Sequence, residues 1–165
     1  MVRRFALDYW AKDSWCMRYH GLKWGESFPG IYQFMLMPRG EESSVFVNGI
    51  QYGGSIFVYS VGDRINIVNQ VDVESYVKGV LALQVPAPLE NEVMAALAII
   101  ARTNAYYSLS RGGDIFWHIS AHQPEYLGNA LCAPGSLVDR AVDATRHLIL
   151  VYSNEGRGLP FAALS

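Results

Sequence analysis

The segment from Tyr76 to Pro88, YVKGVLALQVPAP, places a polar amide where a helix would continue an apolar stripe. Apolar side chains recur at helical spacing at Val73, Tyr76, Val77, Val80 and Leu81. The next member of this stripe is position 84, which is a glutamine. We therefore expect the Gln84 side chain to emerge at the helix C-terminus on the inward-facing, half-buried side.

A carboxylic acid at such a half-buried position would have a raised pKa and would act as a general acid near neutral pH. The amide of Gln84 occupies the same volume and hydrogen-bonds to hydroxyl groups, but it cannot give up a proton. The amide at position 84 therefore indicates a side chain that binds hydroxyl groups of a ligand but transfers no proton.

Arg102 is the charged residue of an alanine-rich apolar segment that lies between Glu92 and Arg111. It could clamp a saccharide or a carboxylate, or it could be a buried arginine that is tied to a backbone carbonyl, to Glu74 or to Asp72. A lone charge on an apolar helix needs a partner in either case, and we favour the structural role. Thr103 follows it and is expected to bond back to its own helix.

A metal site is the weakest of the candidates. His118, His122 and Cys132 could combine with His147 or Cys16, but these residues lack the tight ligand spacing of a zinc site. We predict no metal and no cofactor.

The elements around these residues change type along the chain. Residues 1–29 show no sustained period and are expected to be loop with marginal helix. From Ile31 the pattern turns to strands, and residues 44–71 alternate β-branched or aromatic with polar residues between Asn-Gly, Gly-Gly and Gly-Asp turn signals. This indicates an antiparallel meander of three short strands.

Two consecutive helices follow. Asp72 is a good N-cap for a helix over 73–83, which Pro86 ends. A second helix is expected from near Pro88 to Gly112-Gly113, and its mostly apolar surface predicts that much of it is buried.

The last third predicts a strand from Ile115, a loop, a short helix capped by Ser136, and two final strands, 147–152 and 159–165, around an SNEGRG turn. Antiparallel strands, then two consecutive helices, then further strands with a short helix indicate an α+β fold.

Composition excludes several classes of protein. The 165 residues carry a net charge of −2 without runs of Lys or Arg, so the sequence does not predict the basic surface that nucleic-acid binding requires. The longest apolar run, Val93 to Ala101, is far shorter than the roughly 20 residues of a membrane span. The N-terminus lacks the pattern of a signal peptide.

A long linked motif from Ile65 to Tyr107 gives the strongest signal. Its matching positions are Val71, Glu74, Tyr76, Gly79, Val80, Val85, Pro86, Glu92, Ala96, Ala98, Ala101, Arg102, Thr103 and Ala105. This pattern resembles the SpoIID family, which includes the amidase-enhancer LytB branch. The likeness runs from about Val45 to the end, so we expect a 1–44 extension with an early strand and a 45–165 SpoIID-like domain.

The resemblance implies a peptidoglycan lytic transglycosylase that cleaves between N-acetylmuramic acid and N-acetylglucosamine. In such an enzyme one glutamic acid protonates the glycosidic oxygen and then accepts the proton of the 6-hydroxyl that closes a 1,6-anhydro ring. The position of that acid is Gln84 here. The resemblance therefore implies glycan binding with weak or absent cleavage.

Three explanations of Gln84 stay open. The chain is a natural non-catalytic homologue, which we favour, or it carries an inactivating substitution made to trap substrate, or it is active with its acid elsewhere. In the last case Glu74, Glu90 and Glu125 are the candidates.

The resemblance also singles out Tyr76, Tyr126 and His122 as substrate-binding residues, beside Arg102 and Thr103; a loop histidine without a binding role is the alternative for His122. The implied partners are peptidoglycan glycan strands and a cell-wall amidase, at an extracytoplasmic location. Family members usually continue beyond the final strand into a Gly-rich segment, so a chain that stops at Ser165 implies truncation or an incomplete groove. A non-catalytic amidase-enhancer module is the alternative function.

Overall fold

The computed structural model describes residues 2–7, 34–38, 44–61, 64–85, 89–110, 116–121, 126–128 and 132–151. Within these ranges the elements are β1 (Val2–Leu7), β2 (Phe34–Leu36), β3 (Val45–Val47), β4 (Ile50–Tyr52), β5 (Ser55–Val61), β6 (Arg64–Asp72), α1 (Val73–Gln84), α2 (Asn91–Ser110), β7 (Ile119–Ser120) and α3 (Leu137–Ala144). The predicted α+β fold is confirmed. The predicted SNEGRG turn and the strand over 159–165 lie outside the described residues.

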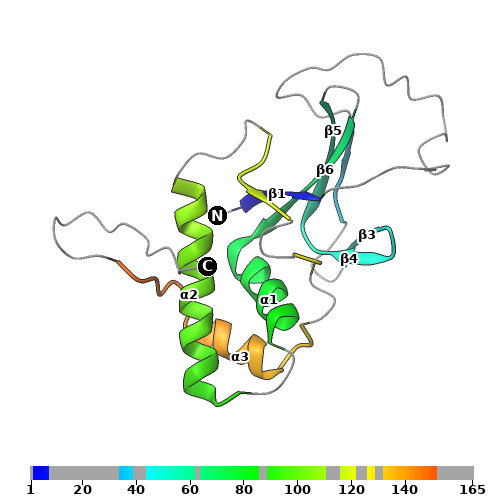
Figure 1. Cartoon of the computed structure of the whole chain (residues 1–165). Helices are drawn as coiled ribbons and strands as arrows, with labels where there is room; N and C mark the ends of the chain where they lie inside the picture. Colours follow the sequence, from blue (N-terminus) through cyan, green and yellow to red (C-terminus); the bar gives the residue numbers. More distant parts are fainter. Residues whose placement is uncertain are drawn as a thin grey trace.

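A five-stranded sheet with the order β2-β5-β6-β1-β7 forms the framework. Its longest pairing joins β5 to β6 antiparallel, from Ser55 opposite Gln70 to Val61 opposite Arg64, and this pair forms the tall ribbon of Figure 1. β1 and β7 run parallel to each other. Because β6 leads without a break into α1, the sheet fixes where the first helix begins.

The N-terminal segment corrects our first expectation. Residues 2–7, expected to be loop, form β1 in the interior of the sheet, where Val2 lies opposite Asp72 and Leu7 opposite Ile67. The pairing partner lies far along the chain, so the local pattern of residues 1–29 does not reveal this strand. Division into 1–44 and 45–165 stays a prediction, although β1 and β2 both pair with strands of the second part.

The predicted meander of three strands is four strands in two sheets. β3 and β4 form a separate hairpin whose turn residues Asn48 and Gly49 have φ of 51° and 80°. Two-residue hairpin turns need positive φ at these positions, and Asn-Gly adopts it readily. Gly53 and Gly54 then separate β4 from β5, which belongs to the larger sheet.

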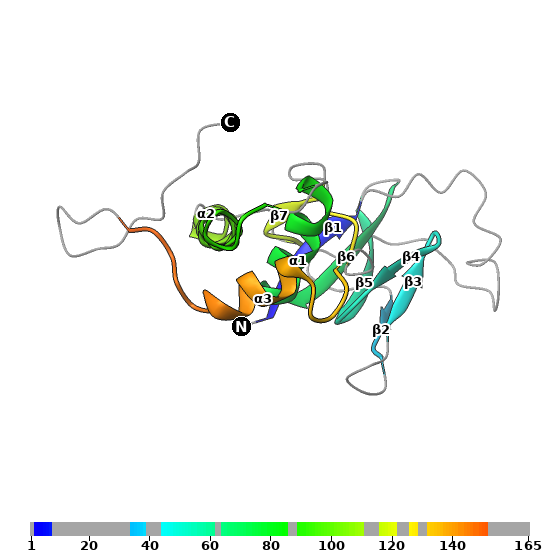
Figure 2. The same ribbon diagram turned by 90° about the horizontal axis from the view of Figure 1, so that it is seen from below.

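The two helices begin and end close to their predicted bounds. The Asp72 carboxylate caps α1 by accepting hydrogen bonds from the backbone N–H groups of Glu74 and Ser75. In both Figures 1 and 2, α1 lies between the strands and the other two helices. Much of α2 was expected to be buried; its fully buried residues form one stripe, and Val93 is 45% exposed.

In the C-terminal part the predicted short helix is α3, where the Ser136 hydroxyl accepts a hydrogen bond from the N–H of Asp139. Of the strand expected from Ile115, the described residues contain β7 alone. Residues 148–150, expected to be a strand, have no regular structure. His147 takes a φ of 67° just after α3, and this left-handed residue redirects the chain.

Candidate functional site

Gln84 is the last residue of α1, and its side chain is exposed. The expected inward-facing position is therefore wrong. Leu81 is 2% exposed, and the residue that continues inward from it is Val85, which is half-buried. The N–H of Val85 still donates to the carbonyl of Leu81, so Val85 completes the final turn and leaves Gln84 on the solvent side.

Exposure changes the chemistry that position 84 supports. A carboxylic acid in open solvent keeps an ordinary pKa of about 4.3, so burial would not prepare it to donate a proton near neutral pH. A substrate that covers the position would have to supply that desolvation. The glutamine itself can both donate and accept hydrogen bonds.

Glu74 is a carboxylate in the first turn of α1, and it is only 4% exposed. Nε of Arg102 lies 3.0 and 3.1 Å from its two carboxylate oxygens, and Nη2 lies 2.6 Å from Oε2. All of these are charge-assisted hydrogen bonds to one fully buried guanidinium. The favoured structural role of Arg102 is confirmed, and Glu74 is not accessible to a substrate in this arrangement.

Arg102 and Thr103 also hold the segment that follows α3. Nη2 of Arg102 donates to the carbonyl of Val142 and Nη1 to that of Leu148, each at 3.1 Å. The Thr103 hydroxyl accepts from the N–H of Leu150 at 2.9 Å and donates to its own helix at the carbonyl of Ile99, as expected. These two adjacent side chains therefore fix the chain over 142–150 against α2.

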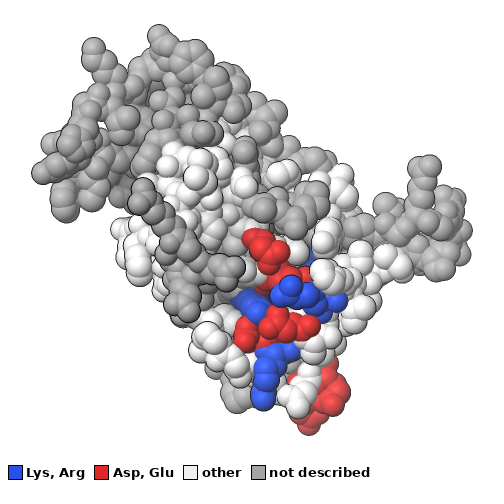
Figure 3. Space-filling view, turned by 180° about the vertical axis from the view of Figure 1, so that it is seen from behind, with Lys and Arg blue, Asp and Glu red and all other residues white. Residues whose placement is uncertain are grey.

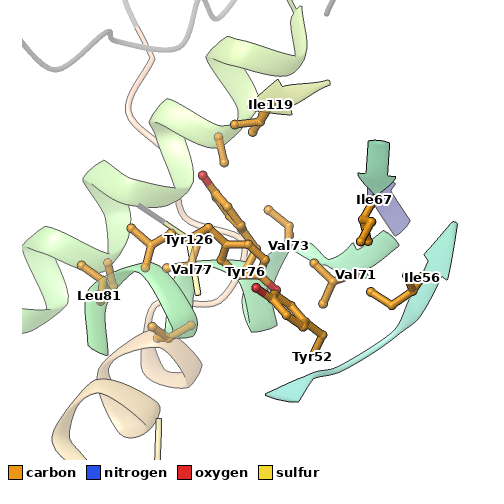
Figure 4. Packing of buried hydrophobic residues seen from close by; sticks show 14 of the residues in the cluster. Tyr52, Ile56, Ile67, Val71, Val73, Tyr76, Val77, Leu81, Ile119 and Tyr126 are labelled. Carbon is orange, nitrogen blue, oxygen red and sulfur yellow. The ribbon is translucent and has the colours of Figure 1, made fainter. Parts of the chain in front are cut away.

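Tyr76 and Tyr126 lie together in the core, where their rings are 5.2 Å apart between centroids and Tyr52 lies 6.1 Å from Tyr126 (Figure 4). Tyr76 is 4% and Tyr126 1% exposed, which leaves almost no ring surface on which a sugar could stack. Burial raises the pKa of both phenols. A direct substrate contact for either ring stays a prediction that this packing does not favour.

A buried asparagine, which sequence reasoning missed, anchors this ring cluster. The hydroxyl of Tyr126 donates to Oδ1 of Asn69 at 2.9 Å, and Nδ2 of Asn69 donates to the carbonyls of Gly53 and Ser55. Asn69 is fully buried, so each of these bonds replaces lost contact with water. The available signal was a polar residue among the apolar positions of β6.

Two glycines let the 126–128 segment approach α1. A Cβ added at Gly79 would lie 2.3 Å from the carbonyl oxygen of Gly128, too close for any side chain. Gly128 has a φ of 70° and would itself meet the carbonyl of Gln51 at 2.2 Å. Gly79 and Gly128 are therefore packing positions between α1, the 126–128 segment and β4.

A charged cluster, also missed from the sequence, joins α1 to α3. Nζ of Lys78 lies 2.6 Å from Asp139 and 3.0 Å from Asp143. Burial lowers the pKa of Lys78, but the hydrogen bonds to both aspartates outweigh it and the pKa is raised. The hydrogen bond from Lys78, followed by that from the N–H of Gly135, lowers the pKa of Asp139.

On the face shown in Figure 3, the described acidic and basic side chains lie side by side, and they form no extended area of one sign. Within the described ranges, no helix is long and apolar enough to span a membrane. The same residues contain no group of three metal-ligating side chains. His122, Glu125 and Cys16 lie outside the described residues, and Glu90 is exposed just before α2.

The chain resembles proteins of two bacterial genera. It is 34% identical to an uncharacterized protein of Chlamydia muridarum over 147 residues, 88% of this chain and 50% of that protein. A Chlamydia pneumoniae protein is 34% identical over 134 residues, 80% of this chain and 49% of its own. A Brachyspira hyodysenteriae protein is 32% identical over 87% of this chain and 39% of its own length.

The chain thus spans half or less of the length of the relatives it matches. No solved structure matches it. The family model described as stage II sporulation protein, SpoIID, matches residues 61–152, which include β6, α1, α2 and α3. The resemblance that the sequence motif indicated is thereby confirmed, and the chain belongs to the SpoIID family.

Proposed function

We propose that the chain is an extracytoplasmic domain that binds peptidoglycan glycan strands and cleaves them weakly or not at all. Membership of the SpoIID family supports a role related to the cell wall. The observation that carries the finer proposal is Gln84, an exposed amide at the end of α1 in the position of the family's general acid.

The chemistry of that side chain separates binding from cleavage. An amide can form hydrogen bonds with sugar hydroxyls both as a donor and as an acceptor. It has no proton to deliver to a glycosidic oxygen and cannot accept one as a carboxylate does. Loss of a general acid costs about 10²- to 10⁴-fold in rate, and more when the same group also serves as the base.

Among the described alternatives, the carboxylates differ in access. Glu74 is enclosed by its hydrogen bonds to Arg102, so it cannot reach a glycan without breaking a buried ion pair. Glu90 is exposed and remains the described carboxylate that could replace the missing acid. Cleavage by the native chain that disappears in Glu90→Gln would transfer the role to that residue.

Co-sedimentation with peptide-stripped glycan strands tests binding. We expect retention of the native chain and about tenfold weaker retention of Gln84→Ala, the effect of losing one good hydrogen bond. Asn48→Gly is the matched control, because it removes an exposed amide at a turn where positive φ suits glycine. Equal retention of Gln84→Ala and Asn48→Gly would contradict a binding role for Gln84.

A second candidate is a non-catalytic module of the amidase-enhancer kind, which brings a wall hydrolase to its substrate. Position 84 has no carboxylic acid, and this fits a non-catalytic module as well as it fits a disabled enzyme. The module would be supported if the chain binds tightly to a purified cell-wall amidase and if neither the native chain nor Gln84→Glu cleaves glycan strands.

A further inference from the structure

A groove with a volume of about 420 Å³ opens between the first turns of α2 and one face of α3. Glu92 and Ala95 line it from α2, and Leu137, Arg140, Ala141 and Ala144 from α3. The volume lies within the range of sites that hold small ligands. Nothing in the proposed glycan contact at Gln84 uses these residues.

Small side chains keep the groove open. Ala95 lines it from α2, and Ala141 and Ala144 line it from α3, so three of its lining side chains are single methyl groups. Ala141 is 6% exposed and forms a packed surface at its base. A ligand that lies on these methyl groups must itself carry small or apolar side chains.

The groove carries one charge of each sign, on facing helices. Glu92 and Arg140 are both exposed, and neither forms an ion pair within the part of the chain that the structure describes. The other charged side chains of α3 differ, because Asp139 and Asp143 both bind Lys78. Arg140 is therefore available to a ligand, and so is the carboxylate opposite it.

We propose that this groove binds a short peptide with small side chains, whose carboxylate pairs with Arg140 and whose ammonium group pairs with Glu92. A guanidinium offers a carboxylate two parallel hydrogen bonds, which gives the site a direction as well as affinity. Peptidoglycan stem peptides contain alanine together with free carboxylate and amino groups. The identification of the ligand as a stem peptide rests on the proposed function. The proposal that the groove binds a short peptide is argued from the residues that line it.

The test is an NMR titration of the full chain with trialanine, which has both charged ends. We expect saturable shifts of backbone amides in residues 91–95 and 137–144. Arg140→Gln should weaken binding about tenfold, and the C-terminal amide and N-acetyl forms of trialanine should each bind more weakly by a similar factor. Arg146→Gln is the matched control, an exposed arginine near the end of α3 that pairs with Asp143.

Ala144→Leu provides an independent variant, because residue 144 is exposed and a leucine there fills the groove without touching the core. It should abolish the titration while the circular dichroism spectrum stays unchanged. No saturable shift up to about 10 mM trialanine, or equal binding of its amide form, would overturn the proposal. A dimer of the chain that Ala144→Leu dissociates would assign the groove to a second copy instead.

Glycan retention measured in parallel keeps the two proposals separate. Arg140→Gln should retain stripped glycan strands like the native chain. If the native chain retains glycan but does not bind trialanine, only the peptide proposal for the groove is contradicted. If the native chain does not retain glycan, the proposed function is contradicted, and the trialanine titration still tests the groove.

Discussion

The two ends of α1 place polar side chains in opposite environments. In the first turn, the Glu74 carboxylate is 4% exposed and receives hydrogen bonds from Arg102. In the last turn, Gln84 is exposed and its side chain is an amide, not a carboxylic acid. Ten residues of helix separate them by about 15 Å. The carboxylate of Glu74 therefore has a structural role, and the accessible amide of Gln84 cannot transfer a proton.

This contrast teaches that a motif residue has to be placed before it is given a role. Glu74, Arg102 and Thr103, which match the motif, connect α1, α2 and the segment after α3 through their hydrogen bonds. The resemblance assigns position 84 to the family's acid, but this chain has an exposed glutamine there, at the end of α1. A change at the first turn should therefore alter stability, and a change at the last turn should alter binding or catalysis.

The largest effect should come from Arg102→Met. This variant leaves Glu74 buried without its partner, and we expect the free energy of unfolding to fall by about 3–5 kcal/mol in denaturant titrations. The double variant Glu74→Leu/Arg102→Met removes both charges and should recover part of the loss. A single variant that loses less than about 1 kcal/mol would show that the pair is not buried in solution.

A smaller effect is expected at the ring cluster. Tyr126→Phe removes the hydroxyl that donates to Asn69 and leaves a buried carbonyl oxygen without that bond. We expect a loss of about 1–3 kcal/mol in the free energy of unfolding. Tyr106→Phe, in a half-buried tyrosine of α2 that packs against the core, is the comparison variant. Equal effects of the two changes would count against a special role for the Asn69 bond.

The cluster between α1 and α3 should contribute less, because its charges are partly exposed. Lys78→Met is expected to cost at most about 1 kcal/mol. The pKa of Asp139 is lowered in the folded state, so its contribution is present above the unfolded pKa of about 3.9 and is lost as the pH falls through the lower folded value. The difference between native and variant stability should therefore shrink from pH 6 to pH 2, and a constant difference would contradict the assignment.

The smallest effect on stability should be at the other end of the helix. Gln84→Glu places a negative charge at an exposed helix C-terminus, which disfavours it by a few tenths of a kcal/mol, and we expect a total change within about 0.5 kcal/mol. Thermal unfolding of the two chains checks this. A loss comparable to that of Tyr126→Phe would mean that position 84 is part of the core.

Local signals predicted the parts of the fold that local chemistry determines. Asp72 and Ser136 each cap a helix with a single side chain, and the Asn48-Gly49 turn closes a hairpin, so all three were visible in the sequence. The strand over 2–7 was not, because it exists through pairing with β6. The strand expected over 147–152 is absent at 147–150, where Arg102 and Thr103 hold the segment through side-chain hydrogen bonds to Leu148 and Leu150.

The sequence singled out candidate site residues, but it did not predict how exposed their side chains are. The motif drew attention to Gln84 and Arg102. The rule that a lone buried charge needs a partner left Glu74, Asp72 and a backbone carbonyl open for Arg102, and the structure pairs it with Glu74. Helical spacing alone could not decide whether residue 84 or 85 continues the buried stripe at the last turn. That choice depends on the packing of Val85, and it reverses the environment of the functional position.

The most direct test of the central claim is the release of 1,6-anhydromuramic products from peptide-stripped glycan strands, scored by mass spectrometry for the native chain and for Gln84→Glu in parallel. We predict release by Gln84→Glu alone, increasing toward acidic pH because an exposed glutamic acid is protonated only near its ordinary pKa. Release by the native chain at a comparable rate would contradict the claim that Gln84 disables the site.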